Sequence, residues 1–380
     1  MNNNLLLKGF EVELFTGDHL ANHVGIASEL SKEMPEFIIE PDLRNIEFIT
    51  EPTKEYNLLR DALILPRIRL RKWLSSKQLT LIPGSTLSMG GSKSFERSDL
   101  SNSYHDYIEK NYGAKVVTTS VHINIGVKDL SKLFAAVRLI RCEAALLLSL
   151  SASSPFLNGK TTGVHSQRWL QFPLTPNKVP IFLSHDHYVH WIKEQLSNRT
   201  MQNERHLWTS VRPNGPKRPY KLDRIELRIC DLITDVDLLL AITALLELRV
   251  IDLFKNTIEL DPINASKLDL NDLQLLCDRN DKASAEKSLD STLFHWLDGK
   301  PILCRDWISS LLKDVLPLAK HLNMADLLTP IYKVLEKGNQ SMRWIDKVSS
   351  GQTVQKVLQD SIVEMKMKEE SILKTEASVN

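Results

Sequence analysis

Alternating apolar and polar positions predict several β-strands in the first 255 residues. In residues 118–127, TTSVHINIGV, valine and isoleucine take every second position, and His122 and Asn124 lie between them. Successive side chains of a strand point to opposite faces, so His122 and Asn124 are expected on the same, polar face. The same alternation predicts strands at 10–15, 44–50 and 223–231.

Helical periodicity follows or separates these strands. Helices are predicted at 19–34, 54–76, 129–150 and 236–254. Beyond residue 255 helical stretches dominate, at 268–297, 306–336 and 351–372, and no strong strand remains. Strands interleaved with helices, followed by helices alone, predict an α+β fold. We expect residues 1–255 to form a catalytic sheet body, with residues 256–380 as a helical C-terminal part packed on the same domain.

Composition and charge narrow the function classes. The chain has 380 residues and is 42% hydrophobic. Its net charge is only +1, so it lacks the surplus of basic residues that would indicate a nucleic-acid partner. The apolar runs 133–150 and 236–254 each contain charged residues and are predicted to be buried helices, not membrane spans. No secretory signal is recognised at the start, so we expect a cytoplasmic protein. The oligomeric state stays open.

Cysteine and histidine patterns argue against a zinc site. The four cysteines are widely scattered, which favours free buried thiols and leaves a regulatory disulfide open. His185, His187 and His190 lie close together, but no further ligand stands at the usual spacing. Exposed histidines are the simpler interpretation.

The polar faces of the four predicted strands carry an unusual set of side chains. They are Glu11, Glu13, Glu47, His122, Asn124, Glu226 and Arg228. A solvated sheet face would explain any one strand, but such faces prefer Thr, Lys and Ser. Carboxylates that converge repel one another unless a cation lies between them, and oxygen donors with one imidazole suit Mg²⁺ or Mn²⁺. Since these ions usually accompany phosphates, the residues predict an ATP-using enzyme whose active-site floor is a sheet.

Six segments in order carry a resemblance to a known family. They are FEVEL, RNIEFIT, SVHINIG, SLSASSPF, TSVRP and DRIELRICD. Together they resemble the glutamate–cysteine ligases of cyanobacterial type, within the carboxylate–amine ligase superfamily. The resemblance runs from Gly9 to about Asp231, whereas the helical last third is similar in length and texture only.

The resemblance implies a fold and a set of roles. The fold would be a strongly curved antiparallel sheet, similar to that of glutamine synthetase, which forms a funnel with the site on its inner face. The implied metal ligands are Glu11, Glu13, Glu47, His122 and Glu226. His122 and Asn124 would also lie at the nucleotide, and Arg228 would be the catalytic arginine that faces the transferring phosphoryl group. Arg168 and Arg212 would be substrate-binding clamps, and Glu40 aligns loosely with an acidic position.

The implied reaction is the ligation of the γ-carboxylate of L-glutamate to the amine of L-cysteine, the first step of glutathione biosynthesis. It would use ATP and Mg²⁺, with Mn²⁺ as a substitute, because a carboxylate must be activated as an acyl phosphate before an amine attacks it. One alternative is a carboxylate–amine ligase with another amine acceptor. Another is a nucleotide-binding regulatory protein without catalysis, whose mark would be loss of Glu226, Arg228 or the Glu11–Glu13 pair. All four residues are present.

Overall fold

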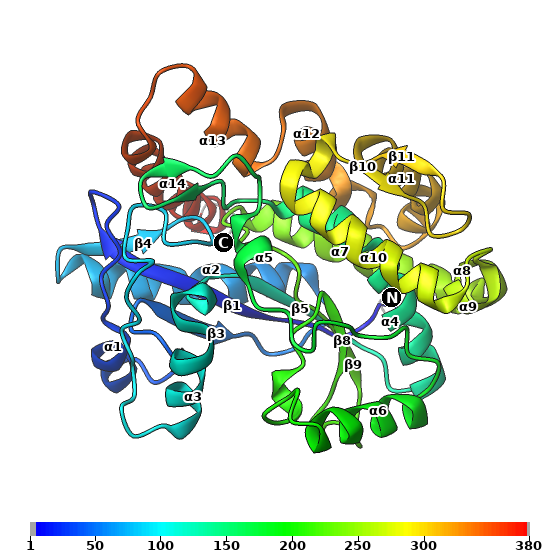
Figure 1. The fold of residues 1–380 in the computed structure, drawn as a ribbon. Helices are drawn as coiled ribbons and strands as arrows, with labels where there is room; N and C mark the ends of the chain where they lie inside the picture. The colour runs from blue at the N-terminus through cyan, green and yellow to red at the C-terminus, as the bar shows by residue number, and fades with distance from the viewer. Residues whose placement is uncertain (1–4, 378–380) are drawn as a thin grey trace.

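An antiparallel sheet of seven strands forms the centre of the part of the chain that the structure, a computed structural model, describes: residues 5–377, with side chains to residue 372 (Figure 1). The strands run β1 (Lys8–Asp18), β2 (Phe37–Ile39), β3 (Asn45–Ile49), β4 (Leu79–Ile82), β5 (Val121–Gly126), β8 (Val211–Asn214) and β9 (Arg224–Leu227). Their order is β2-β3-β1-β5-β9-β8, and β4 pairs with the far end of β1. The predicted α+β class and the antiparallel sheet are confirmed.

Three long helices supply much of the apolar core that covers the sheet: α2 (Tyr56–Ser75), α4 (Leu130–Ser151) and α7 (Val236–Lys255). Nearly all side chains of α4 and α7 are buried, as their apolar runs predict. Their charged side chains are paired inside the protein: Arg249 of α7 donates to Glu143 of α4 at 2.6 Å, and Glu247 lies 2.9 Å from Lys8. Over the described residues, no helix is both long enough and apolar enough to cross a membrane.

The helices after residue 255 pack on this core, mainly on the upper side of the view in Figure 1. They are α8 (Thr257–Leu260), α9 (Pro262–Ala265), α10 (Leu270–Lys287), α11 (Cys304–His321), α12 (Thr329–Lys337), α13 (Gln340–Ser349) and α14 (Val354–Ala377). Helix α10 lies on α4, α11 lies on α7, and Glu369 of α14 pairs with Arg67 and Arg71 of α2 at 2.7 Å. This packing supports our proposal that residues 256–380 belong to the same domain.

Three predicted helices differ from the sequence-based expectation, one of them being 306–336, which is interrupted between the end of α11 at His321 and the start of α12 at Thr329. The predicted helix 19–34 is helical only in α1 (Ala27–Glu33), because the Asp18 carboxylate accepts the N–H groups of Leu20 and Asn22 and closes a turn there. The predicted helix 268–297 ends at Lys287, where Ser288 adopts a φ of 42°. A short hairpin of β10 (Thr292–Phe294) and β11 (Pro301–Leu303) follows, so the C-terminal part is not helical throughout.

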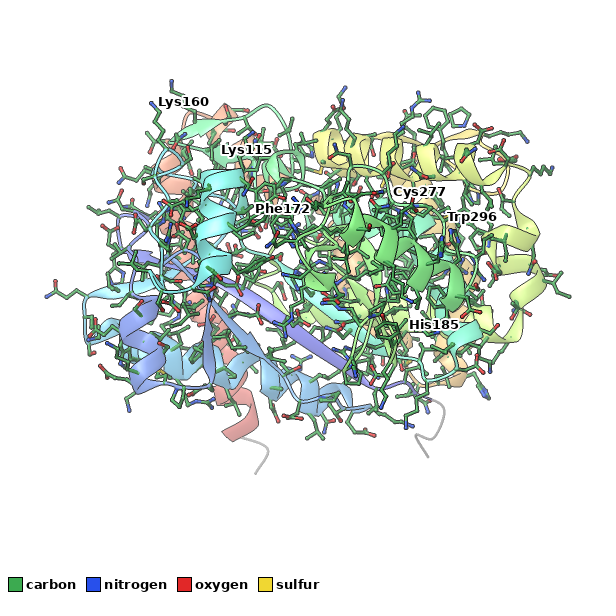
Figure 2. The ribbon with its side chains drawn as sticks, turned by 60° about the horizontal axis from the view of Figure 1, so that its bottom comes forward. Lys115, Lys160, Phe172, His185, Cys277 and Trp296 are labelled. Carbon is green, nitrogen blue, oxygen red and sulfur yellow. The ribbon has the colours of Figure 1, made fainter. Side chains whose placement is uncertain are left out.

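The remaining elements connect the sheet to its cover. They are α3 (Ser103–Tyr112), α5 (Gln167–Gln171), α6 (His185–Ser197) and the hairpin of β6 (Phe156–Leu157) and β7 (Lys160–Thr161). His185 opens α6 (Figure 2), and its Nε2 lies 2.8 Å from the carbonyl of Pro219. All four cysteines are buried free thiols, as predicted; Cys277, also labelled in Figure 2, is one of them.

Candidate active site

The strand register brings the predicted polar residues face to face. Across β1 and β3, Glu13 lies opposite Glu47, and across β1 and β5, Glu11 lies opposite His122. Asn124 and Arg212 each lie opposite Glu226, from the two strands that flank β9. Directly opposed residues have Cβ atoms about 5 Å apart, so one row of polar side chains crosses five strands.

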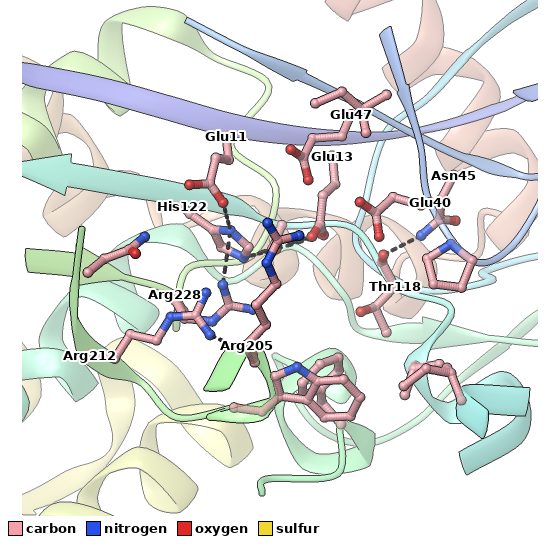
Figure 3. Close-up of a pocket in the computed structure, with 18 of the residues that line it drawn as sticks. Glu11, Glu13, Glu40, Asn45, Glu47, Thr118, His122, Arg205, Arg212 and Arg228 are labelled. Atoms are coloured by element: carbon pink, nitrogen blue, oxygen red, sulfur yellow. Dashed lines mark hydrogen bonds and ion pairs between the residues drawn. The ribbon is translucent and has the colours of Figure 1, made fainter. Parts of the chain in front are cut away.

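This row forms the floor of a cavity of about 800 Å³. Figure 3 shows four glutamates, Glu11, Glu13, Glu40 and Glu47, on one side of the cavity and Arg205, Arg212 and Arg228 on the other. The predicted residues that line it are Glu11, Glu13, Glu47, His122, Arg168, Arg212 and Arg228. Glu226 is fully buried beneath these side chains, and Asn124 lies next to them, hydrogen-bonded to Glu11 at 3.2 Å.

His122 connects the two acidic residues of β1. Its Nδ1 lies 3.0 Å from Glu11 Oε2, and its Nε2 lies 3.1 Å from the Ser120 hydroxyl, which donates to Glu13 at 2.8 Å. Although burial opposes ionisation of Glu11, the hydrogen bond from His122 contributes to a lowered pKa of that carboxyl. His122 is itself almost fully buried, so these hydrogen bonds hold its ring in one orientation.

Glu226 is held by a second set of contacts. Arg212 donates two hydrogen bonds to its two oxygens, at 2.7 and 2.9 Å, and Asn214 donates a third at 2.6 Å. Arg228 also donates to Glu226 Oε1 and lies 3.3 Å from His122 Nδ1. Burial acts against the charge, but the two arginines hold the pKa of Glu226 well below its usual range. The carboxylate therefore orients both guanidinium groups.

Two glutamates on the opposite side, Glu40 and Glu47, form no ion pair with an arginine or lysine among the described residues. Burial and the charge of Glu13 raise the pKa of Glu40 to about 7, and burial and the charge of Glu40 raise the pKa of Glu47 well above its usual range. Separately, ligand atoms of Glu11, His122 and Glu226 all lie within 4.8 Å of one another. Glu40 and Glu47 repel each other when both are ionised, and a bound cation would remove this repulsion. With the nearby imidazole and the other carboxylates, they form a donor set suited to divalent cations that prefer oxygen ligands. The donor set is thus consistent with Mg²⁺ or Mn²⁺.

Arg168 contacts the protein backbone more than the cavity. Its guanidinium donates to the carbonyls of Ile229 at 3.1 Å and Arg228 at 3.0 Å, and it lies 3.8 Å from Asp231. Its position therefore supports the segment that carries Arg228.

Sequence reasoning missed four cations on the cavity wall: Arg205, Lys217, Arg218 and Arg224. Nη1 of Arg218 is buried without a hydrogen-bond partner among the described residues, and it lies 4.0 Å from Glu226. For Lys217 and Arg218 the signal was present in PNGPKRPYK, residues 213–221, which concentrates basic residues in the loop after β8. The missing information was that this loop folds over the sheet.

The fold and the cavity define a class: an α+β protein whose antiparallel sheet places acidic residues and fixed arginines on opposite sides of one site. Comparison with known proteins identifies the family. The model of glutamate–cysteine ligase family 2 (GCS2) matches residues 7–369, so the chain belongs to this family. The resemblance inferred from the six segments is confirmed.

Individual relatives are more distant. The chain is 28% identical over 258 residues to a protein of Nocardia farcinica provisionally named glutamate–cysteine ligase 2-2, and the match covers 66% of this chain and 65% of that protein. It is 33% identical over 131 residues to a similarly named protein of Sorangium cellulosum, covering 33% of each chain. The chain thus spans less than two thirds of the length of these curated relatives.

Two solved structures share the fold. A glutamate–cysteine ligase of Francisella tularensis in complex with AMP superposes with a TM-score of 0.75 at 15% identity, covering 98% of this chain and 94% of that one. A bifunctional glutathione synthetase of Pasteurella multocida gives a TM-score of 0.74 at 14% identity, covering 96% of this chain and 53% of that one. At these identities the similarity establishes the fold alone.

Proposed function

We propose that the protein is an ATP-dependent ligase that joins the γ-carboxylate of L-glutamate to the amine of L-cysteine, with Mg²⁺ or Mn²⁺ as cofactor. One observation carries the proposal: the glutamate cluster and Arg228 face each other across a cavity on one face of the sheet. The chain in which they do so belongs to the glutamate–cysteine ligase family. The AMP complex of the Francisella tularensis structure supports nucleotide use. In a cytoplasmic setting the reaction would be the first step of glutathione biosynthesis.

The acidic side of the cavity is proposed to hold the metal ions. Glu13 and Glu47, with Glu40, would form one ligand set, and Glu11, His122 and Glu226 the other. Glu226 would contribute Oε1, which lies 3.8 Å from His122 Nδ1 and also accepts hydrogen bonds from Arg212 and Arg228. Its Oε2 would remain bound by Arg212 and Asn214. Bound cations would supply charge neutralisation for the phosphates of ATP.

Arg228 is proposed as the catalytic residue. Glu226 and the backbone contacts of Arg168 fix its position, so its charge needs no reorganisation when negative charge develops on the transferring phosphoryl oxygens. In the first step an oxygen of the γ-carboxylate attacks the γ-phosphorus and ADP leaves. In the second the amine attacks the acyl carbon, phosphate leaves and the amine loses a proton. Asn124 is proposed to contact the nucleotide together with His122.

The basic wall is proposed to bind the amino-acid substrates. Arg212 was predicted as a clamp, yet its Nε and Nη2 groups already donate hydrogen bonds to Glu226 and are not available to a substrate. Arg218, whose Nη1 lacks a partner, and Arg205 are better placed to receive a substrate carboxylate beside Arg212. Arg168 would then act as a positioning residue for Arg228.

The test is ADP release by the purified protein with ATP, Mg²⁺ and glutamate, in the presence of a panel of amines. We expect release that requires both glutamate and cysteine, with γ-glutamylcysteine identified by mass spectrometry. Turnover with another amine but not with cysteine would establish the alternative ligase. No turnover with any amine, despite ATP binding, would favour the non-catalytic alternative.

A further inference from the structure

Arg228 lies just beyond the regular part of the sheet. Strand β9 ends at Leu227, which is paired with Val211 at the start of β8. The next backbone hydrogen bond runs from the N–H of Arg228 to the carbonyl of Ser210 at 2.8 Å, and it joins two residues that lie outside both strands. From this position the Arg228 side chain reaches the cavity (Figure 3). The placement of its guanidinium group therefore depends on how firmly the segment that contains Ser210 is held.

That segment is held by a buried arginine of α4. Nη1 of Arg141 donates to the hydroxyl oxygen of Thr209 at 2.6 Å and to that of Ser210 at 2.7 Å. All three residues are buried, and hydrogen bonds from a charged donor are stronger than those between neutral groups. Arg141 does not line the cavity, so it does not touch a substrate there. It can act on the site only through the two hydroxyl groups that it binds.

The charge of Arg141 is balanced by the C-terminal part of the chain. Its Nη2 donates to Asp278 of α10, and Asp281 follows three residues further along the same helix. Burial opposes the positive charge, but the carboxylates of Asp281 and Asp278 raise the pKa of Arg141. The planar guanidinium group can bind two hydroxyl groups and a carboxylate at the same time, because its N–H groups point in fixed, different directions. Arg141 therefore connects α10 to the segment before β8.

The carbonyl group of Arg228 is held from the other side. Nη2 of Arg168 donates to it at 3.0 Å, and Arg168 lies 3.8 Å from the buried Asp231. One buried guanidinium group thus acts on the carbonyl of Arg228, and another acts, through Ser210, on its N–H. Such a firm hold matters for catalysis, because a displacement of about 1 Å can cost about a hundredfold in rate.

We propose that Arg141 is a positioning residue for Arg228. Through the hydroxyl groups of Thr209 and Ser210 it fixes the carbonyl group to which Arg228 donates its N–H. This inference rests on the catalytic role proposed for Arg228. It also gives the helices after residue 255 a part in the reaction, because α10 supplies the carboxylates that hold Arg141.

The test removes the two hydroxyl groups and leaves every charge in place. Thr209→Val keeps the shape of the side chain and Ser210→Ala removes a single oxygen atom, so the double variant should fold. We would measure kcat and KM for ATP and glutamate and, separately, hydrogen exchange at the Arg228 amide by mass spectrometry. We expect kcat to fall at least about tenfold while both KM values stay within about twofold of the parent. Exchange at the Arg228 amide should become at least about tenfold faster, because local opening exposes its N–H.

A matched control removes the same number of hydroxyl groups from the contact between α4 and α10. The hydroxyl oxygens of Ser149 and Ser284 lie 2.7 Å apart there, and both residues are fully buried. The Ser149→Ala, Ser284→Ala double variant should lower Tm but leave kcat and exchange at the Arg228 amide within about twofold of the parent. Arg141→Lys is a second variant, which keeps the charge but has one nitrogen in place of the planar fork. It should lower kcat and speed exchange as the Thr209→Val, Ser210→Ala variant does.

The outcomes are distinguishable. Unchanged exchange at the Arg228 amide in both the Thr209→Val, Ser210→Ala variant and Arg141→Lys would overturn the positioning role, whatever happens to kcat. An equal fall of kcat in the serine control would also overturn it, because the loss would then follow stability. Faster exchange in the two variants of a protein that releases no ADP with any amine would support the hold on Arg228 and overturn the proposed function instead.

Discussion

Two glutamates on the same sheet face should respond to the same substitution in opposite ways. Glu226→Gln keeps the shape of the side chain but replaces one acceptor oxygen with an amide group that faces donors of Arg212, Asn214 or Arg228. Removing one partner of a buried ion pair typically costs about 3–5 kcal/mol, because the remaining charge stays buried. With an unfolding entropy of about 2.1 cal/mol/K per residue over 380 residues, this corresponds to a fall in Tm of about 4–6 °C.

Glu47→Gln should leave the metal-free protein as stable as the parent. The raised pKa of Glu47 means that its neutral form is favoured beside Glu40 and Glu13, and glutamine resembles that neutral form. Its Tm in EDTA at pH 7 should therefore match or exceed the parent value. With saturating Mg²⁺ the parent should gain stability through ligand linkage, and Glu47→Gln should gain much less.

The measurement is calorimetric melting of the three proteins at one scan rate, with EDTA and with Mg²⁺, beside ADP release. Both variants should lose most activity, so only the melting temperatures distinguish the two kinds of glutamate. A fall of several degrees for Glu47→Gln in EDTA, or no fall for Glu226→Gln, would refute this charge distribution.

Three further predictions concern the same cavity. The pKa of Glu40 is about 7 in the folded protein against an ordinary value of 4.5, so the folded state binds this proton more tightly than the unfolded state does. The contribution of this proton to the free energy of unfolding is therefore complete below pH 4.5 and is lost as pH rises through about 7. Melting in EDTA from pH 4.5 to 8 should show this decline, and Glu40→Gln should reduce it; an unchanged decline would contradict the assignment. Arg228→Lys keeps the charge but loses the planar fork, so kcat should fall about 10²–10³-fold without recovery at high Mg²⁺; recovery would indicate a metal-binding role. His122→Ala should lose most activity with a smaller fall in Tm than Glu226→Gln, and a large fall with near-normal activity would make His122 a packing residue.

Much of this architecture could be predicted from local sequence. Strand alternation alone placed His122 and Asn124 on one face and the apolar residues of 118–127 on the other, because the two-residue period follows from backbone geometry. The long apolar runs of α4 and α7 similarly predicted buried helices. Turn chemistry was a weaker guide: the Asp18 side chain ends β1 in a turn that helical periodicity did not reveal.

The neighbours of each polar residue were decided by tertiary structure. Alternation gives the face of a side chain but not the register between strands, and only register places Glu11 opposite His122 and Arg212 opposite Glu226. The difference between Glu226, neutralised by two arginines, and Glu47, crowded by other carboxylates, follows from those neighbours and not from residue type. The sequence by itself determined which side chains the sheet presents; the pairing of strands distant in the chain determined which of them are counterions and which repel, because electrostatic energy depends on distances that only the folded chain defines.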